Sequence, residues 1–274
     1  MSPRVSGILG FALTTQDPER LARFYQQLGF TVEPSEPIPR SELDVLGISG
    51  GGERVPLGLG GARMTLDCFD ESGREYPRSS TAADICFQHF AIVTDDATAA
   101  WKQAIKAGAE PISPHGPVTL PVSSGGVTAC KFRDPDGHPL EFLQFPSASG
   151  VEWHGKGLLG IDHSAISVSD AGKSKTFYER LGLSIGRPTL NQGQAQEALD
   201  GLAAPIVEVV PMLPPRGRPH LELLAYKSPI GRANIPLPAN DVAATRINWA
   251  SDRDELIRDP DGHLVVLKSG AISQ

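Results

Sequence analysis

The hexapeptide Arg-Asp-Pro-Asp-Gly-His occurs twice in the chain, at residues 133–138 and 258–263. Three residues after its histidine, the first copy carries Glu141 and the second carries Val266. A carboxylate at this position could bind a divalent metal ion or transfer protons, whereas a valine could do neither. The turn itself is explained by backbone chemistry, because proline fixes φ and glycine permits a positive φ. We therefore interpret the hexapeptide as structural in both copies, and Glu141 as the residue that distinguishes them.

The elements that would position such residues repeat along the chain. The segment ILGFALTTQDPERLARFYQQLGFTV begins at residue 8, and IDHSAISVSDAGKSKTFYERLGLSIG begins at residue 161. The two align without a gap as far as the Leu-Gly pair. Each predicts an alternating strand, an aspartate turn that caps a helix, an amphipathic helix and a second strand. The glycine after the leucine suits a helix C-terminus.

A second pair of repeats interleaves with the first. ICFQHFAIVTDDATAAWKQAIKAGAEPI, from residue 85, predicts strand, helix and strand, and leads to the first hexapeptide hairpin. ATRINWASDRDELIRDPDGHLVVL, from residue 244, predicts the first strand and the hairpin without a helix. The chain is thus interpreted as four βαβββ-like units, of which the fourth is abbreviated. The Gly/Ser-rich stretch at residues 146–157 predicts a boundary between units two and three.

This arrangement resembles the vicinal oxygen chelate superfamily, which includes glyoxalase I, extradiol dioxygenases, fosfomycin-modifying enzymes and bleomycin-resistance proteins. The resemblance covers nearly the whole chain and is carried by FY-x-x-LG after a helix together with DPDGH-x-x-E on a final hairpin. It implies an α+β fold in which repeated βαβββ modules pair into two cup-shaped open barrels. It also implies that a ligand or metal ion lies inside a cup.

The resemblance further implies where metal ligands lie, because each unit of that superfamily can supply one from its first strand and one from its last. The first-strand positions here are Gly10, His89, His163 and Arg246, and the last-strand positions are Asp67, Glu141, Glu222 and Val266. The expected ligands of one divalent ion (Fe, Mn, Zn, Ni or Co) are therefore His89, Glu141, His163 and Glu222, with Asp67 as a further candidate. Glu141 and Glu222 are also the candidate catalytic groups for moving protons.

Two pairings of the units are compatible with the sequence. The conventional pairing, one with two and three with four, gives domains at 1–147 and 159–274 joined by a linker at 148–158. It would unite Asp67, His89 and Glu141. The alternative, one with four and two with three, would unite both histidines with Glu141 and Glu222. For the fold we favour the conventional pairing.

Three residues near Glu222 are candidates for binding substrate. His220 lies two residues before Glu222 and therefore shares its face of the strand, where it could act as an acid/base group or a substrate donor. Arg216 and Arg218 belong to the adjoining segment PPRGRPH and could receive an anionic group of the substrate.

Composition narrows the classes of partner. The net charge of −7 and the lack of a dense Lys/Arg stripe argue against nucleic acid, and no apolar run is long enough for a membrane helix. Cys68, Cys86 and Cys130 lie inside apolar runs and predict buried thiols in a reducing compartment, which favours a cytoplasmic location. We expect a small-molecule substrate as partner, with a homodimer as a candidate assembly.

The favoured function is a metal-dependent enzyme whose ion grips two adjacent oxygens of a small substrate and polarises them as a Lewis acid. Glyoxalase-like, isomerase or lyase chemistry fits such a site. Ring cleavage would have to depart from the usual extradiol pattern, because unit four ends in Val266 and lacks a histidine ligand. The alternative is a metal-free small-molecule binding protein of the bleomycin-resistance type, which Gly10 and Val266 favour.

Overall fold

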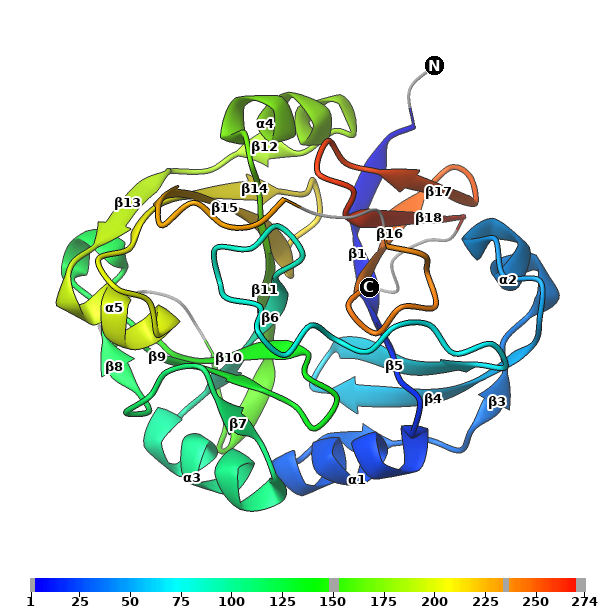
Figure 1. Cartoon of the computed structure of the whole chain (residues 1–274), viewed down its shortest axis with the longest axis horizontal. Helices are drawn as coiled ribbons and strands as arrows, with labels where there is room; N and C mark the ends of the chain where they lie inside the picture. The colour runs from blue at the N-terminus through cyan, green and yellow to red at the C-terminus, as the bar shows by residue number, and fades with distance from the viewer. Residues whose placement is uncertain (1–2, 148–152, 234–236, 270–274) are drawn as a thin grey trace.

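The computed structural model describes residues 3–147, 153–233 and 237–269, which form two curved mixed sheets with helices around their periphery (Figure 1). The helices are α1 (Pro18–Leu28), α2 (Arg40–Leu46), α3 (Ala97–Ala107), α4 (Ala171–Arg180) and α5 (Gln194–Asp200), with a 3-10 turn at Val122–Ser124. Within the described ranges, no helix has the length and apolarity needed to cross a membrane. The cytoplasmic location stays a prediction.

The expected aspartate caps are confirmed. The side chains of Asp17, Asp96 and Asp170 each accept a hydrogen bond from a backbone N–H in the first turn of α1, α3 and α4. Gly29 follows α1 with a φ of 109°, a left-handed conformation that glycine adopts at no steric cost. The aspartate caps therefore mark where α1, α3 and α4 begin, and Gly29 marks where α1 ends.

Among the described residues, one sheet has eight strands and the other has ten. The eight-stranded sheet contains β1 (Val5–Thr14), β2 (Thr31–Val32), β3 (Glu36–Pro37), β4 (Gly52–Leu59), β5 (Ala62–Phe69), β16 (Arg246–Ser251), β17 (Glu255–Arg258) and β18 (Leu264–Ser269). The ten-stranded sheet contains β6 (Gln88–Thr94), β7 (Glu110–Pro111), β8 (Val118–Thr119), β9 (Thr128–Arg133), β10 (Pro139–Gln144), β11 (Leu158–Ser167), β12 (Ser184–Ile185), β13 (Thr189–Gln192), β14 (Ile206–Leu213) and β15 (His220–Ser228).

The sheets join the units in the alternative order, not in the conventional order that we favoured. β1 pairs antiparallel with β16, so units one and four share the eight-stranded sheet. β6 pairs antiparallel with β11, so units two and three share the other. In the strand order β11-β6-β10, one strand of unit two, β6, separates β10 from β11. Each sheet thus draws strands from both sides of the linker, and the division into domains at 1–147 and 159–274 stays a prediction.

Units that do not share a sheet are joined by the repeated motifs. Tyr25 of the first FY-x-x-LG helix donates a hydrogen bond to Asp134 Oδ2 at 2.9 Å, and Tyr178 of the second donates to Asp259 Oδ2 at 3.3 Å. The other oxygen of Asp134 accepts from the backbone N–H groups of Asp136 and His138. The hexapeptide turn of units two and four is therefore fastened to the helix of units one and three.

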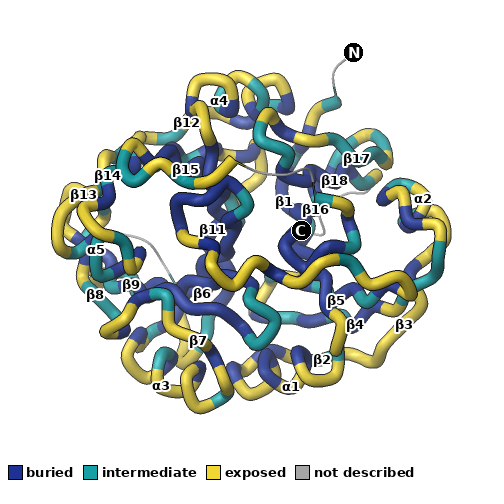
Figure 2. Tube along the Cα trace, in the orientation of Figure 1, coloured by how far each residue is buried: buried dark blue, intermediate teal, exposed yellow. Residues whose placement is uncertain are grey.

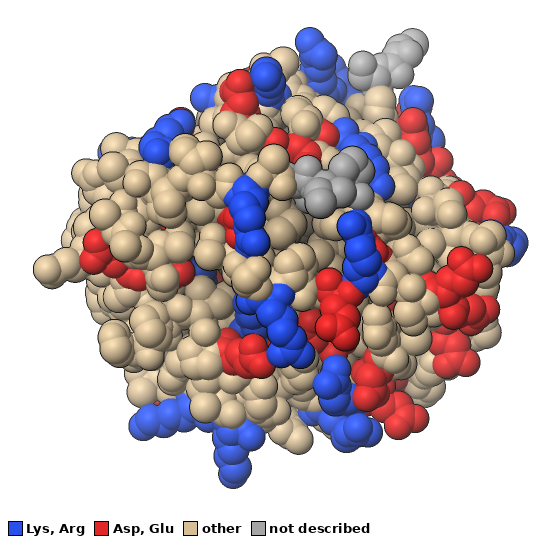
Figure 3. Space-filling view, in the orientation of Figure 1, with Lys and Arg blue, Asp and Glu red and all other residues tan. Residues whose placement is uncertain are grey.

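A common apolar core extends across both sheets. The rings of Phe11 on β1 and Phe90 on β6 stack with centroids 5.7 Å apart, which links the central strands of the two sheets. Figure 2 shows these central strands as buried and the surrounding helices as exposed on their outer sides. On the face drawn in Figure 3, basic side chains are interspersed with acidic ones.

Gly10 marks a close approach between β1 and β5. A Cβ atom at this position would lie 2.6 Å from the carbonyl oxygen of Arg63, well inside van der Waals contact. Unit one therefore has no room for a side chain at its first-strand position, where units two and three carry His89 and His163.

Tyr25→Phe removes a donor from the buried carboxylate of Asp134. We expect it to lower the free energy of unfolding by about 1.5–3 kcal/mol, the range for a hydrogen bond to a charged group. Tyr76→Phe is the matched control, since Tyr76 Oη donates to the neutral carbonyl of Cys86 at 3.2 Å. It should cost only about 0.5–1.5 kcal/mol. Urea denaturation measures both, and equal losses would show that the charge of Asp134 contributes nothing.

Gly10→Ala forces a methyl group against the Arg63 carbonyl, and we expect a loss of about 1–3 kcal/mol in the free energy of unfolding. Gly61→Ala is the control, because a Cβ there meets no atom within 4 Å. Its effect should stay within about 0.5 kcal/mol. Thermal unfolding of the two variants compares them directly, and an unchanged stability of Gly10→Ala would contradict the close approach.

Candidate metal centre

Strand register places the expected ligands of units two and three on one face of the ten-stranded sheet. Glu141 on β10 pairs with Ala91, two residues beyond His89 on β6. Glu222 on β15 pairs with Ala165, two residues beyond His163 on β11. The histidine and glutamate of each unit therefore have the same relative register, and the junction of β6 with β11 brings the two sets together.

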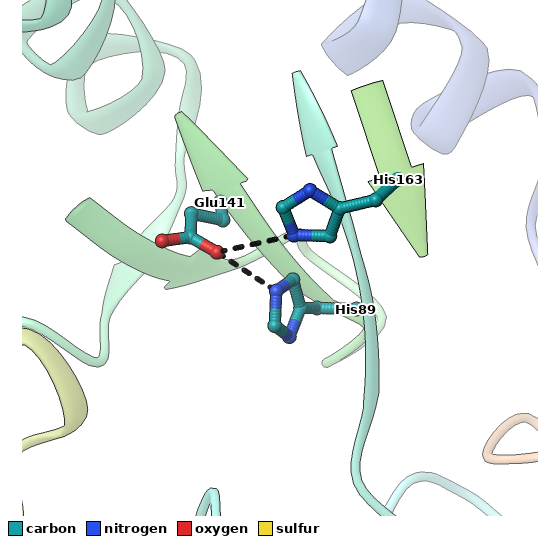
Figure 4. A group of neighbouring side chains, drawn as sticks. All are labelled: His89, Glu141 and His163. Atoms are coloured by element: carbon teal, nitrogen blue, oxygen red, sulfur yellow. Dashed lines mark ion pairs between the residues drawn. The ribbon is translucent and has the colours of Figure 1, made fainter. Parts of the chain in front are cut away.

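Three of these side chains converge (Figure 4). His89 Nε2 lies 2.8 Å and His163 Nε2 lies 4.0 Å from Glu141 Oε2. One ligand atom from each of the three residues lies within 4.8 Å of the others. All three residues are buried, yet neither ring nitrogen of His89 has a hydrogen-bond partner of acceptable geometry in the described part of the chain. A buried ring nitrogen without a hydrogen bond, close to a carboxylate, suits the binding of a divalent cation.

Glu222 stands next to this group, outside it. Its Oε2 lies 3.5 Å from His163 Nε2, and its Oε1 lies 3.4 Å from His220 Nε2. The Glu222 side chain is 20% exposed, against 8% for Glu141. His220 is 14% exposed, so these two residues form the more open side of the site.

Asp162 is a neighbour of the site that the sequence reasoning missed. Its Oδ2 lies 3.1 Å from His163 Nδ1, although consecutive residues of a regular strand point to opposite faces. A register shift between Ile161 and His163 interrupts the alternation and turns both side chains toward the same region. The only sequence signal was an aspartate directly before the expected ligand His163. Asp162 directs the Nε2 atom of His163 toward Glu141 and Glu222.

The pKa values of His163 and Glu222 depend on each other, because each side chain lies close to the opposite charge of the other. Burial acts to lower the pKa of His163, but the charge of Glu222 and the hydrogen bond with Asp162 outweigh it and raise the pKa to about 9. Burial acts to raise the pKa of Glu222, but the charge of His163 and the hydrogen bond with His220 lower it to about 2. For His89, burial dominates and lowers the pKa, so this imidazole is neutral near pH 7.

Lys131 closes the other side of the site and was also missed. It is the direct cross-strand partner of Glu141 and is almost fully buried. Its Nζ lies 2.7 Å from Asp200 Oδ1, while Asp200 Oδ2 accepts hydrogen bonds from Gln196 and Tyr226. Burial opposes ionisation of Glu141, but the contact with His89 and the charge of Lys131 keep its pKa below the usual value.

Asp67 does not join the other candidate ligands. It lies in the eight-stranded sheet, where Arg54 Nε is 2.7 Å from Oδ1 and Arg246 Nη2 is 3.1 Å from Oδ2. The register also makes Thr65 the counterpart of Glu141 and Glu222, because Thr65 pairs with Ala12, two residues beyond Gly10. Both oxygens of Asp67 are thus engaged by guanidinium groups.

The two candidate arginines lie differently from each other. Arg218 Nε is 3.3 Å from Asp162 Oδ1, and its guanidinium lies over the ring of Trp153 at 5.8 Å from the centroid. Arg218 therefore belongs to the edge of the site. Arg216 donates its backbone N–H to the carbonyl of Ser6, and the residue is exposed.

Known proteins share this fold. A family model described as the Glyoxalase/Bleomycin resistance protein/Dioxygenase superfamily matches residues 7–142. Glyoxalase I from Zea mays superposes with a TM-score of 0.59 at 16% identity, covering 96% of this chain and 92% of that chain. A candidate dioxygenase from Bacillus subtilis gives a TM-score of 0.58 at 12% identity, covering 96% of this chain and 85% of that chain. At such identities the two structures show a shared fold and nothing of the reaction.

The repeated units, the curved sheets and the matching family model agree with one another: the chain belongs to the glyoxalase, bleomycin resistance protein and dioxygenase superfamily.

Proposed function

We propose that the ten-stranded sheet holds one divalent metal ion through His89, Glu141 and His163, and that the protein is an enzyme of the vicinal oxygen chelate type. The observation that carries this proposal is the convergence of three ligand atoms within 4.8 Å, on strands from two units. One of the three residues is the buried His89, whose ring nitrogens make no hydrogen bond of acceptable geometry to any described residue. Two imidazoles and one carboxylate match the preferences of Fe, Mn, Co, Ni or Zn.

When bound, the ion would supply Lewis-acid polarisation of two neighbouring oxygens on a small substrate. The protein's own groups have separate roles around it. Asp162 holds the His163 ring in one orientation through Nδ1, and this leaves Nε2 free to act as a ligand. Lys131 offsets part of the negative charge gathered by Glu141, Glu222 and Asp200.

Glu222 is the group best placed to move a proton. It lies beside the three proposed ligands and has the more exposed carboxylate, 20% against 8% for Glu141. An ionised carboxylate accepts protons, so Glu222 acts as a general base toward the substrate. His220 Nε2 lies 3.4 Å from Glu222 Oε1 and orients this carboxylate. This assignment favours isomerase, lyase or glyoxalase-like chemistry over ring cleavage.

The first test is metal content by mass spectrometry on protein purified without chelator or affinity metal. We expect about one ion per chain, lost in His89→Ala, His163→Ala and Glu141→Gln because three protein ligands are the minimum for a catalytic site. Glu222→Gln should keep the ion, since Glu222 stands outside the group of three. The exposed His115→Ala is the control.

Two outcomes would change this account. Loss of the ion in Glu222→Gln as well would make Glu222 a fourth ligand and remove it as the base. A wild-type protein that contains no metal and takes up none on titration would favour the metal-free small-molecule binding protein instead.

The second test uses the proton on His163. Its pKa of about 9 lies above the ordinary value, so the imidazole is charged below pH 9 and must lose that proton to become a ligand. The affinity for Zn²⁺ should therefore rise about tenfold per pH unit up to pH 9 and then level off. Calorimetry at pH 7 in buffers of different ionisation enthalpy should count about one released proton. Release of none would show that His163 carries no proton to lose at pH 7 or is not a ligand, and the loss of the ion in His163→Ala decides between the two.

A further inference from the structure

Two long connections pass from one sheet to the other (Figure 1). Residues 70–87 lead from β5 to β6, and residues 229–245 lead from β15 to β16. Each contains a Gly-Arg pair followed by an aspartate. The first connection carries Gly73-Arg74 and Asp84, and the second carries Gly231-Arg232 and Asp241. The same residue types therefore recur in the same order on both connections.

Each arginine binds the aspartate of the other connection. Arg232 donates its backbone N–H to Asp84 Oδ1 at 2.7 Å and its Nη2 to Asp84 Oδ2 at 2.7 Å. Arg74 donates its backbone N–H to Asp241 Oδ1 at 2.7 Å and its Nε to Asp241 Oδ2 at 2.9 Å. The residue after each aspartate donates its own backbone N–H to the carbonyl of that arginine, at 3.0 and 2.9 Å. We name these two sets of bonds the Arg232 latch and the Arg74 latch.

The part of the first connection that the Arg232 latch holds lies against the concave face of the ten-stranded sheet. These residues, 79–85, form turns and contain no helix or strand, and we call them the strap. Ala82 of the strap is fully buried in one apolar cluster with Phe87 and Ala165. Ala165 is the cross-strand partner of both His89 and Glu222, and the ring of Phe87 lies 5.7 Å from that of His89. The strap therefore lies beside the candidate metal centre.

The metal centre needs more space than the structure gives it. The side chains of His89, Glu141 and His163 are only 2%, 8% and 7% exposed. The cavities of about 410, 330 and 280 Å³ in the described part of the chain are lined by other residues. Small-molecule sites have volumes of about 300–1,000 Å³. A neighbouring segment therefore has to move before a substrate can occupy the space beside the three ligands.

The 410 Å³ cavity borders both the strap and the surroundings of the metal centre. Residues 80–82 of the strap line it, and so does Asp200. Asp200 binds Lys131, the cross-strand partner of Glu141. Ala82 belongs to the wall of this cavity and also to the apolar cluster on the sheet. Displacement of Ala82 would therefore join the cavity to the space beside the metal centre.

The strap is attached more weakly than the other walls of the site, which are strands paired through backbone hydrogen bonds. Arg232 also donates to the carbonyl oxygen of Ser79 at 2.7 Å, so it holds both ends of the strap. Its side chain is 59% exposed, and water and salt therefore screen its ion pair with Asp84. Two further side-chain hydrogen bonds hold the middle of the strap, from Arg133 Nη2 to Ser80 O at 2.7 Å and from Ser167 Oγ to Ala82 O at 2.6 Å.

We propose that residues 79–85 are a movable strap, that the Arg232 latch holds it closed, and that its opening joins the 410 Å³ cavity to the metal centre. This inference rests on the proposed function, because it concerns access to the proposed metal site. The Arg74 latch has a different role, since Asp241 belongs to the connection whose Ala239 and Ala244 pack on the eight-stranded sheet. The two latches thus hold different segments with the same kind of bonds.

The first test is the rate at which excess EDTA removes Zn²⁺ from the zinc-loaded chain. Arg232→Gln should release Zn²⁺ at least tenfold faster than the wild type. Its equilibrium affinity for Zn²⁺ should stay within twofold, because a strap that opens more often speeds entry and exit equally. Arg74→Gln is the matched control, since the Arg74 side chain is 56% exposed and binds an equally buried aspartate. It should change the release rate less than twofold.

The second test is hydrogen exchange of the metal-free chain, measured by mass spectrometry. Amides of residues 79–87 should exchange at least tenfold faster in Arg232→Gln than in the wild type, and within twofold of the wild type in Arg74→Gln. Thermal unfolding midpoints should fall by similar amounts in both variants. A general loss of stability would then not explain a difference between them.

The outcomes separate this inference from the proposed function. Unchanged zinc release in Arg232→Gln would overturn the strap, because it would show that ions reach the centre past Glu222 and His220. Equal acceleration in both variants would overturn it as well. A wild-type chain that binds no Zn²⁺ would overturn the proposed function, and the exchange rates, which need no metal, would still decide whether the Arg232 latch holds the strap closed.

Discussion

Antiparallel pairing of β6 with β11 is the constraint on which the candidate site depends. Each of these strands contributes one histidine, and each carries its own glutamate strand as its other neighbour, β10 beside β6 and β15 beside β11. The junction therefore sets the separation between His89 and His163, since neither unit alone carries both histidines. Removing this contact between units two and three would leave two incomplete pairs of ligands in place of one group of three.

The hexapeptide turns support this arrangement from outside the sheets. Asp134 is held by Tyr25 of α1 while it organises the turn that leads into β10, the strand that carries Glu141. The corresponding bond between Tyr178 and Asp259 fixes the turn before β18, where the residue at the same place is Val266. The motif is thus retained in both copies for a structural reason, and the carboxylate that follows it is free to differ.

Much of this could be predicted from the sequence, because the information is local and repeated. Alternation along each strand placed His89 and Glu141 on one face, and the repeat transferred the same reasoning to His163 and Glu222. The pairing of units is decided by contacts between distant segments, and it was predicted wrongly for the fold. Asp162 escaped notice because a bulge overrides the alternation on which the reasoning depended. Lys131 was missed because its position opposite Glu141 appears only once β9 and β10 are paired in register.

The concave faces of the two sheets carry different sets of charged side chains. In the ten-stranded sheet, carboxylates outnumber the fixed cations around two histidines, and a divalent ion would restore the balance. In the eight-stranded sheet, Gly10 is required by the close approach of β5, and Arg246 replaces the other histidine. Arg246 is held by Asp67 in a buried ion cluster whose disruption would leave an unpaired charge, so it is not free to change alone. Val266 adds no charge to this cluster, so the eight-stranded sheet carries neither the imidazole nor the carboxylate that the ten-stranded sheet places at the corresponding positions.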